Sequence, residues 1–115
     1  MKGYKGFDKN LQCRGKQYEV GQTYKENEAI LCEKGLHFCE LPHDVFAYYG
    51  AGDSRFAEIE AEEVSDNTDS DSKLVCKKIT VKVEISVFDI CKIAVNAFFE
   101  KFGFDEKIKN RRDIL

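Results

Sequence analysis

Alternation of apolar and polar side chains is clearest between residues 74 and 87. Every second position from residue 79 onward is a β-branched aliphatic residue: Ile79, Val81, Val83, Ile85 and Val87. A period of two places such side chains on one face of a β-strand, and β-branched residues favour that conformation. The pattern therefore predicts a long strand, Leu74–Val87, whose apolar face is buried along its whole length.

Shorter segments also have strand character: Gly3–Phe7, Gln17–Val20, Leu36–Glu40 and Ser54–Ala61. In the third of these, alternation places Leu36 and Phe38 on one face and His37 and Cys39 on the other. Residues 8–15 read as a turn. For residues 26–31 the sequence pattern fits either a strand or a single helical turn.

Two helices are predicted. Pro42 suits the first turn of a short helix because its missing N–H would have no intrahelical partner there. The apolar face of that helix holds Val45, Phe46, Tyr48 and Tyr49. A second helix, Asp89–Phe102, begins at an N-cap or first-turn acid and ends before Gly103. Its core-facing side chains at helical spacing are expected to be Ile90, Ile93, Ala94, Ala97 and Phe98.

Together these elements predict one α+β domain with a mainly antiparallel sheet, packed by the short helix after Pro42 and by the C-terminal helix. Residues 1–86 would form its core and residues 87–115 its last helix and a basic tail. The 115 residues, 43% of them hydrophobic, suffice for one domain. No apolar run reaches the roughly 18 residues of a membrane span, and no secretion signal opens the chain. We expect a cytoplasmic protein that does not associate with membranes.

Five cysteines cannot all pair with one another, so reduced thiols are expected. Cys76 and Cys91 lie in apolar runs and are expected to act as small buried hydrophobic residues. Cys32, His37, Cys39 and His43 could hold zinc, but the chain lacks the Cys-x2-Cys pair that such sites favour. No metal and no cofactor is therefore predicted, and a zinc-stabilised module stays an alternative.

Charge is unevenly distributed along the chain, although the net charge is only −3. Residues 56–72 contain seven acidic and no basic side chains, and the C-terminus is basic. One interpretation is a solvated loop; the other is an electrostatic docking surface. The candidate docking residues are Glu62, Glu63, Asp66, Asp69, Lys107, Lys109, Arg111 and Arg112. A nucleic acid is not the predicted partner, because the chain carries no overall positive charge.

Several short motifs point to a known group of proteins: Gly3-Tyr-Lys-Gly-Phe7, Cys13-Arg-Gly15, Gly35-Leu-His-Phe-Cys-Glu40 and Tyr48-Tyr49. They resemble a small domain that recurs in phage, prophage and other bacterial mobile-element proteins, over roughly residues 3–86. The resemblance implies a small accessory protein in a bacterial host cell. It implies no activity.

The order of elements is also similar to that of ADP-ribosyltransferases, which implies a related scaffold. Those enzymes carry an Arg or His on the first strand and a catalytic Glu late in the chain. Lys5 stands at the first position. Neither Gln-x-Glu nor Glu-x-Glu occurs near a later strand, and Glu58-x-Glu60 lies too early in the chain. No catalytic residue is therefore predicted. If a cleft exists, its candidate residues are Lys5, His37, Tyr48 and Arg55.

The preferred function is a protein that binds a bacterial host protein, for example an inhibitor of a defence system such as an anti-CRISPR protein. The alternatives are a small NAD-using enzyme of the ADP-ribosyltransferase type and a zinc-stabilised structural module. Docking predicts binding that depends on surface charge, catalysis predicts turnover of a dinucleotide, and a zinc module predicts stoichiometric metal.

Overall fold

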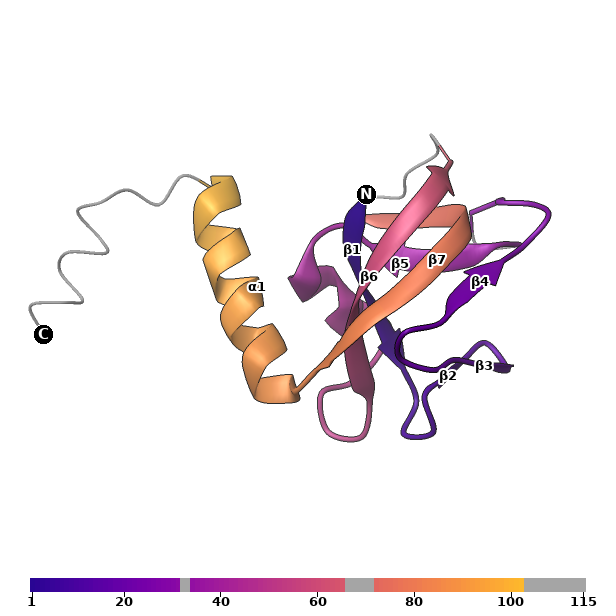
Figure 1. Cartoon of the computed structure of the whole chain (residues 1–115). Coiled ribbons are helices and arrows are strands. Elements are labelled where there is room, and N and C mark those ends of the chain that lie inside the picture. The colour runs from indigo at the N-terminus through magenta and orange to yellow at the C-terminus, as the bar shows by residue number, and fades with distance from the viewer. Residues whose placement is uncertain (32–33, 66–71, 103–115) are drawn as a thin grey trace, which may run out of the picture.

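Seven strands, one 3₁₀-helix and one α-helix make up the part of the chain that the computed structural model describes, residues 1–31, 34–65 and 72–102 (Figure 1). The elements are β1 (Lys2–Phe7), β2 (Gln12–Cys13), β3 (Lys16–Gln17), β4 (Thr23–Lys25), β5 (Leu36–Cys39), η1 (Pro42–Ala47), β6 (Arg55–Val64), β7 (Lys73–Ile85) and α1 (Val87–Phe102). All the strand pairs among these residues are antiparallel. The predicted α+β domain with an antiparallel sheet is confirmed.

The main sheet curls so that the strands at the two ends of its order, β4 and β6, both pair with β7. β1 pairs along its whole length with β6, and β6 pairs with β7. The other edge of β7 pairs with β5 and then with β4. β5 returns to β1 at a single pair, Tyr4 opposite Cys39. Four strands thus form a closed ring that is weakest where β5 meets β1.

The long strand β7 does not keep one face buried, contrary to the prediction. Val83 lies opposite Glu58, but Val81 lies opposite Ile59, so one residue of β7 has no partner between them. Such a bulge switches the side chains that follow to the other face of the sheet. Ile79 and Val81 therefore pack in one core, whereas Ile85 packs in the other and Val83 is 47% exposed.

Two clusters of buried side chains occupy the two faces of the sheet. The first is built around Phe7, Tyr18, Phe38, Ile59 and Val81. The second holds Tyr4, Cys39, Val45, Phe56, Ile85 and Ile90, and it joins the sheet to η1 and α1. Figure 1 shows α1 standing beside the sheet, with η1 between them. The alternation predicted for β5 is confirmed, because Phe38 belongs to the first core and Cys39 to the second.

The helix α1 begins two residues before the predicted start. The Ser86 hydroxyl accepts the backbone N–H of Asp89 (3.1 Å), so Ser86 takes the capping role and Asp89 is an acid of the first turn. Ile90 is fully buried and Ala94 nearly so, as predicted. Phe98 is not a core residue: it is 40% exposed and meets the edge of the His43 ring.

Further apolar side chains of α1 are exposed, namely Phe88 at 72% and Val95 at 49%. Cys91 is exposed as well, contrary to prediction, whereas Cys76 is buried as expected. The prediction failed at these positions because α1 carries apolar residues on more than the one side that faces the sheet. A periodicity of 3.6 does not show which of two apolar sides is buried.

Smaller differences concern the short elements. The strand predicted at residues 17–20 is limited to β3, and the expected turn before it contains β2. Residues 26–31 form neither a helical turn nor a strand, apart from one isolated bridge between Ile30 and Lys34. The helix at Pro42 is confirmed as η1. Within the described ranges, no helix is both long and apolar enough to cross a membrane.

Candidate functional site

A pocket of about 380 Å³ opens where β1, β5 and η1 meet. Its lining includes Lys5, Arg14, His37, Tyr48, Tyr49 and Lys73. Lys5, His37 and Tyr48 were predicted as cleft residues from the sequence, and the fold brings these three together. Arg55, the fourth, does not line the pocket.

The pocket exists because the ladder between β1 and β5 stops after one pair. With Tyr4 opposite Cys39, the next pairs in register would be Lys5 with Phe38 and then Gly6 with His37, but the ladder stops before them. The backbone carbonyl of His37 accepts a hydrogen bond from the amine of Lys5. A side chain therefore satisfies a carbonyl that would otherwise need a strand partner.

Lys5 is almost completely buried, with only 3% of its surface exposed. Its amine lies 5.8 Å from the centre of the Phe7 ring and 5.3 Å from that of Tyr18, within the range of cation–π contacts. Burial lowers the pKa of this amine below its ordinary value, and the nearby Cys13 thiol acts in the opposite direction. Among the described residues, no carboxylate forms an ion pair with it.

His37 lies beside the guanidinium of Arg14. Nη1 of Arg14 is 3.0 Å from Nδ1 and 3.3 Å from Nε2 of the imidazole, which is 6% exposed. Burial lowers the pKa of His37 to about 4, with further lowering by the charges of Arg14 and Lys73. The ring is therefore neutral near pH 7 and accepts a hydrogen bond from the arginine.

Stability should depend on pH through His37. The pKa of this group in the folded protein, about 4, lies below the ordinary value of 6.5, so the unfolded chain binds more protons between these limits. We expect the free energy of unfolding to fall as pH decreases from about 6.5 to about 4. Urea titrations at several pH values should show a shallower decrease for His37→Gln than for the wild type. Parallel profiles for the wild type and His37→Gln would contradict the buried neutral imidazole.

Two tyrosines from the end of η1 form the apolar wall of the pocket. The ring of Tyr49 lies against β1 at Gly6, where an added Cβ would come within 2.5 Å of its Cδ2 atom. The Tyr49 hydroxyl donates to the Cys13 sulfur (3.0 Å), and burial raises the pKa of this phenol. Tyr48 is 43% exposed, and the Lys73 amine lies 4.4 Å from its ring centre.

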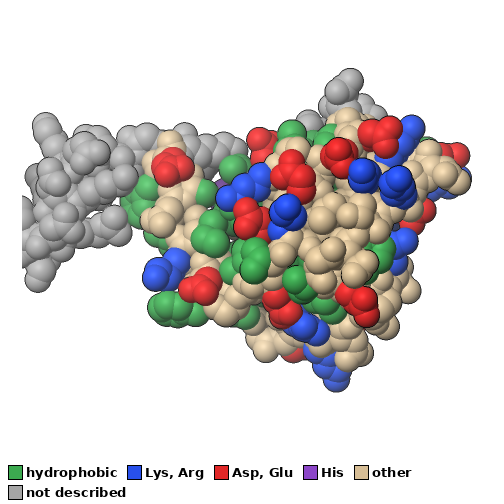
Figure 2. Space-filling model, in the orientation of Figure 1, with side chains coloured by type: hydrophobic (Ala, Val, Ile, Leu, Met, Phe, Trp, Pro, Cys, Tyr) green, Lys and Arg blue, Asp and Glu red, His purple; other side chains and the backbone are tan. Residues whose placement is uncertain are grey.

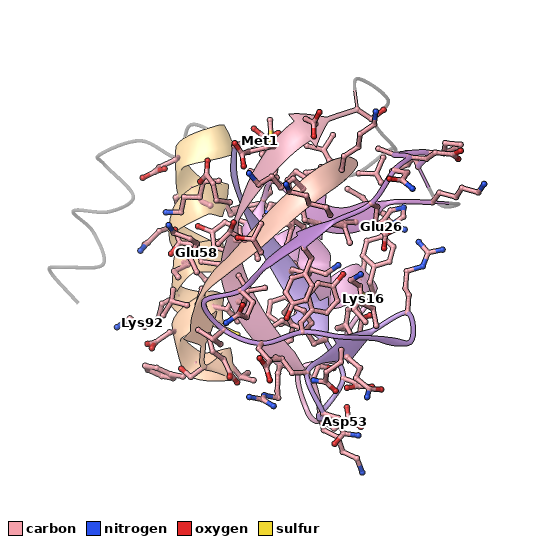
Figure 3. The ribbon with its side chains drawn as sticks, turned by 45° about the vertical axis from the view of Figure 1, so that its right-hand side comes forward. Met1, Lys16, Glu26, Asp53, Glu58 and Lys92 are labelled. Carbon is pink, nitrogen blue, oxygen red and sulfur yellow. The ribbon has the colours of Figure 1, made fainter. Side chains whose placement is uncertain are left out.

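The charged side chains among the described residues that line this pocket are all basic. Lys5, Arg14 and Lys73 line it, and its described lining contains no Asp or Glu. A second cavity of about 280 Å³ shares Lys5, Arg14 and His37, and its outer part holds the ion pair of Lys16 with Glu26 at 3.2 Å. Figure 3 shows this pair on the side of the molecule away from α1. Lys5 therefore borders two cavities at once.

Arg55 belongs to a different part of the surface. Its guanidinium donates two hydrogen bonds to the Glu84 carboxylate, at 2.8 and 2.6 Å. The pair raises the pKa of Arg55 and lowers that of Glu84, and both side chains are partly exposed. The sequence could not show this cross-strand pairing, because it depends on the register of β6 against β7.

The predicted docking surface is only partly described. Glu62 forms an ion pair with Lys78 at 3.0 Å, and Glu63 is exposed. The other candidates lie outside the described residues: Asp66, Asp69, Lys107, Lys109, Arg111 and Arg112. On the face that Figure 2 shows, the described acidic and basic side chains over the sheet are interspersed.

The described residues offer no group of three metal-binding side chains. His37 and Cys39 do line the same pocket, but the guanidinium of Arg14 lies 3.0 Å from the His37 ring and would repel a cation. His43 instead contacts Asp44 at 3.4 Å. Cys32, the remaining candidate ligand, lies outside the described residues.

Sequence reasoning missed two basic residues of the site. Arg14 and Gly15 both have positive φ, 53° and 79°, so Cys13-Arg14-Gly15 is a tight turn that directs Arg14 towards His37. That triplet was noticed only as part of a motif. Lys73 opens β7 opposite Cys39, which no local pattern indicates.

Comparison with known proteins gives one match. The family described as Domain of unknown function (DUF7666) matches residues 1–93. The chain belongs to this family. The match includes every residue that lines the pocket, together with the first part of α1. No curated protein and no solved structure matches the chain.

Proposed function

We propose that this DUF7666 domain acts by binding, and that its pocket receives an anionic group. The observation that carries the proposal is Lys5, a buried amine that borders the pocket and has no carboxylate partner among the described residues. A buried charge without a counter-ion is destabilising by several kcal/mol unless it is paired or loses its proton. An anion in the pocket would pair with the protonated amine, and without an anion the buried amine favours its neutral form.

Arg14 and Lys73 extend the positive potential from Lys5 towards the opening. Arginine favours carboxylate and phosphate because its planar fork matches two oxygens at once. The rings of Tyr48 and Tyr49 add an apolar wall beside these cations. This combination fits a ligand with a flat apolar part next to an anionic group. A cavity of about 380 Å³ has the size of small-ligand sites, and it could equally take one anionic side chain of a larger partner.

The described lining supports binding more than acid–base catalysis. It contains no carboxylate, and its histidine is neutral and engaged by Arg14. A general base needs a pKa near the working pH and access to the substrate proton. The positions of Lys5, His37 and Tyr48 in one pocket remain compatible with a scaffold like that of ADP-ribosyltransferases, but similarity of scaffold does not carry activity.

Anion binding can be tested with small aromatic probes. Calorimetric titration should show that phenyl phosphate and benzoate bind, whereas benzyl alcohol, which has the ring but no charge, does not. Arg14→Gln and Lys73→Gln should each weaken the binding about tenfold, the effect of losing one charged hydrogen bond. Lys25→Gln, on the exposed part of β4, removes the same charge outside the pocket and should have little effect. Equal binding of benzyl alcohol, or equal loss in Lys25→Gln, would contradict the proposal.

A protein partner is the second candidate function, and the exposed apolar side chains of α1 favour it. Figure 2 shows hydrophobic side chains along this helix, among which Phe88 is 72% exposed. Exposed aromatic residues at protein surfaces are frequent anchors of interfaces. The resemblance to phage domains makes a bacterial host protein the expected partner, in the manner of an inhibitor of a defence system.

This partner hypothesis predicts a specific pattern in affinity capture from a bacterial lysate. A stoichiometric protein should be retained by the wild type and lost with Phe88→Ser. Val20→Ser alters an apolar side chain of 45% exposure outside α1 and should retain it. If charge steers the encounter, association should slow as salt rises and after reversal of Glu62 and Glu63. Retention by Phe88→Ser as strong as by the wild type would exclude α1 as the contact.

A further inference from the structure

The amine of Lys5 is a nucleophile in a setting that suits covalent capture. It borders both cavities, and the wider one also contains the cations Arg14 and Lys73. We propose that Lys5 forms a reversible imine with an aldehyde or ketone that carries an anionic group. This inference rests on the proposed anion pocket and specifies the chemical class of its ligand.

Lysine condenses with carbonyl compounds only as the neutral amine, and most lysines are protonated at pH 7. Enzymes that use lysine in this way bury it in apolar surroundings or place it beside another cation. Lys5 meets the first condition, since it is 3% exposed among aromatic rings, and it shares its pocket with the cations Arg14 and Lys73. The lowered pKa of its amine agrees with this arrangement.

The reaction balances without any further reagent. The amine nitrogen attacks the carbonyl carbon, a C–N bond forms, and the electrons of the C=O π bond move to oxygen. One amine proton passes to that oxygen, which gives the carbinolamine. The C–O bond then breaks, and the hydroxyl group leaves with the second amine proton as water, so that the C=N bond of the imine remains. When protonated, the imine retains one N–H, which can continue to donate to the His37 carbonyl that Lys5 already contacts.

The surrounding cations determine which carbonyl compounds would be captured. Arg14 and Lys73 can hold a carboxylate or a phosphate beside the carbonyl carbon, and the attraction raises its local concentration near Lys5. Tyr48 and Tyr49 favour a compound with a flat ring. A neutral carbonyl compound lacks the anchor and should react little faster with Lys5 than with a surface lysine.

The test uses pyridoxal 5′-phosphate as an anionic aromatic aldehyde and pyridoxal as its match without the phosphate. Glyoxylate, an aldehyde with a carboxylate, distinguishes the two kinds of anion. The whole chain is incubated with each probe near pH 7, reduced with borohydride and analysed by peptide mass spectrometry. We expect Lys5 to be trapped at least tenfold more than Lys9 or Lys25, because the pocket holds the anionic group of the probe beside Lys5 and burial leaves more of its amine neutral. Trapping at Lys5 should also persist to lower pH than trapping at these surface lysines.

Peptide mapping of the wild type needs no substitution, so the test does not depend on a variant that folds. Lys5→Met should remove the adduct if circular dichroism shows that the variant is folded, and Lys25→Met should leave it. Modification spread over surface lysines, or equal trapping of pyridoxal and its phosphate at Lys5, would overturn the imine. Binding of phenyl phosphate without any trapping at Lys5 would also overturn it, while leaving the anion pocket standing. Loss of both would remove the proposed function as well.

Discussion

Replacing Phe56 by Ala is expected to lower the free energy of unfolding by about 3–5 kcal/mol, the usual effect of emptying a buried aromatic site. Phe56 lies on β6 and has no exposed surface. Its ring meets that of Phe46 edge-on at 5.3 Å and packs in the cluster that contains Ile85 and Ile90. The substitution therefore loosens the sheet, η1 and α1 from one another, because all three share this core.

Urea denaturation followed by circular dichroism measures this loss. Phe88→Ala provides the matched control, since it removes the same ring from a position that is 72% exposed, and it should change stability by less than about 0.5 kcal/mol. If the two variants lose stability equally, α1 packs on the body through a different face from the one described. Phe98 is 40% exposed, so the stability lost in Phe98→Ala should lie between the losses in Phe56→Ala and Phe88→Ala.

Most strands could be predicted because their signal is local. Alternation in β5 and β6 depends only on the side chains of each strand, and both strands lie where the pattern placed them. The face of β7 could not be predicted, because its bulge is visible only in the register of Val81 and Val83 against β6. The apolar residues of β7 alternate regularly along the sequence, but those before the bulge pack in one core and Ile85, after it, packs in the other.

The candidate site could likewise be predicted only as far as its residues carry a local signal in the sequence. Lys5 was a candidate because it stands where ADP-ribosyltransferases carry an Arg or His on the first strand, and His37 because it lies in the Gly35-Leu-His-Phe-Cys-Glu40 motif. Their approach follows from the early end of the β1–β5 ladder, which neither segment reveals alone. Arg55 was predicted to lie with them in the cleft, yet it pairs with Glu84, 29 residues away along the chain. Proximity across the sheet decides which side chain each basic residue contacts.

Gly35→Ala should be the most damaging of the single-methyl additions, with an expected loss of about 4 kcal/mol. Gly35 has a φ of 101°, which side chains rarely adopt, and such strain amounts to roughly 1–3 kcal/mol. A Cβ there would also lie 2.8 Å from the carbonyl oxygen of Glu28 and 2.9 Å from the Cα of Ala29. Because both are backbone atoms they cannot move aside cheaply, and overpacking of this kind adds about 1–3 kcal/mol.

Two other glycines separate the strain from the collision. Gly21 also has a positive φ, 89°, but nothing lies within 4 Å of its added Cβ, so Gly21→Ala should lose only about 1–2 kcal/mol. Gly50 has neither a positive φ nor a close neighbour, and Gly50→Ala should be neutral or slightly stabilising. Equal losses in Gly35→Ala and Gly21→Ala would show that β5 shifts to accommodate the methyl group. Such a shift would move His37, two residues further on, and should then appear as weaker binding of phenyl phosphate.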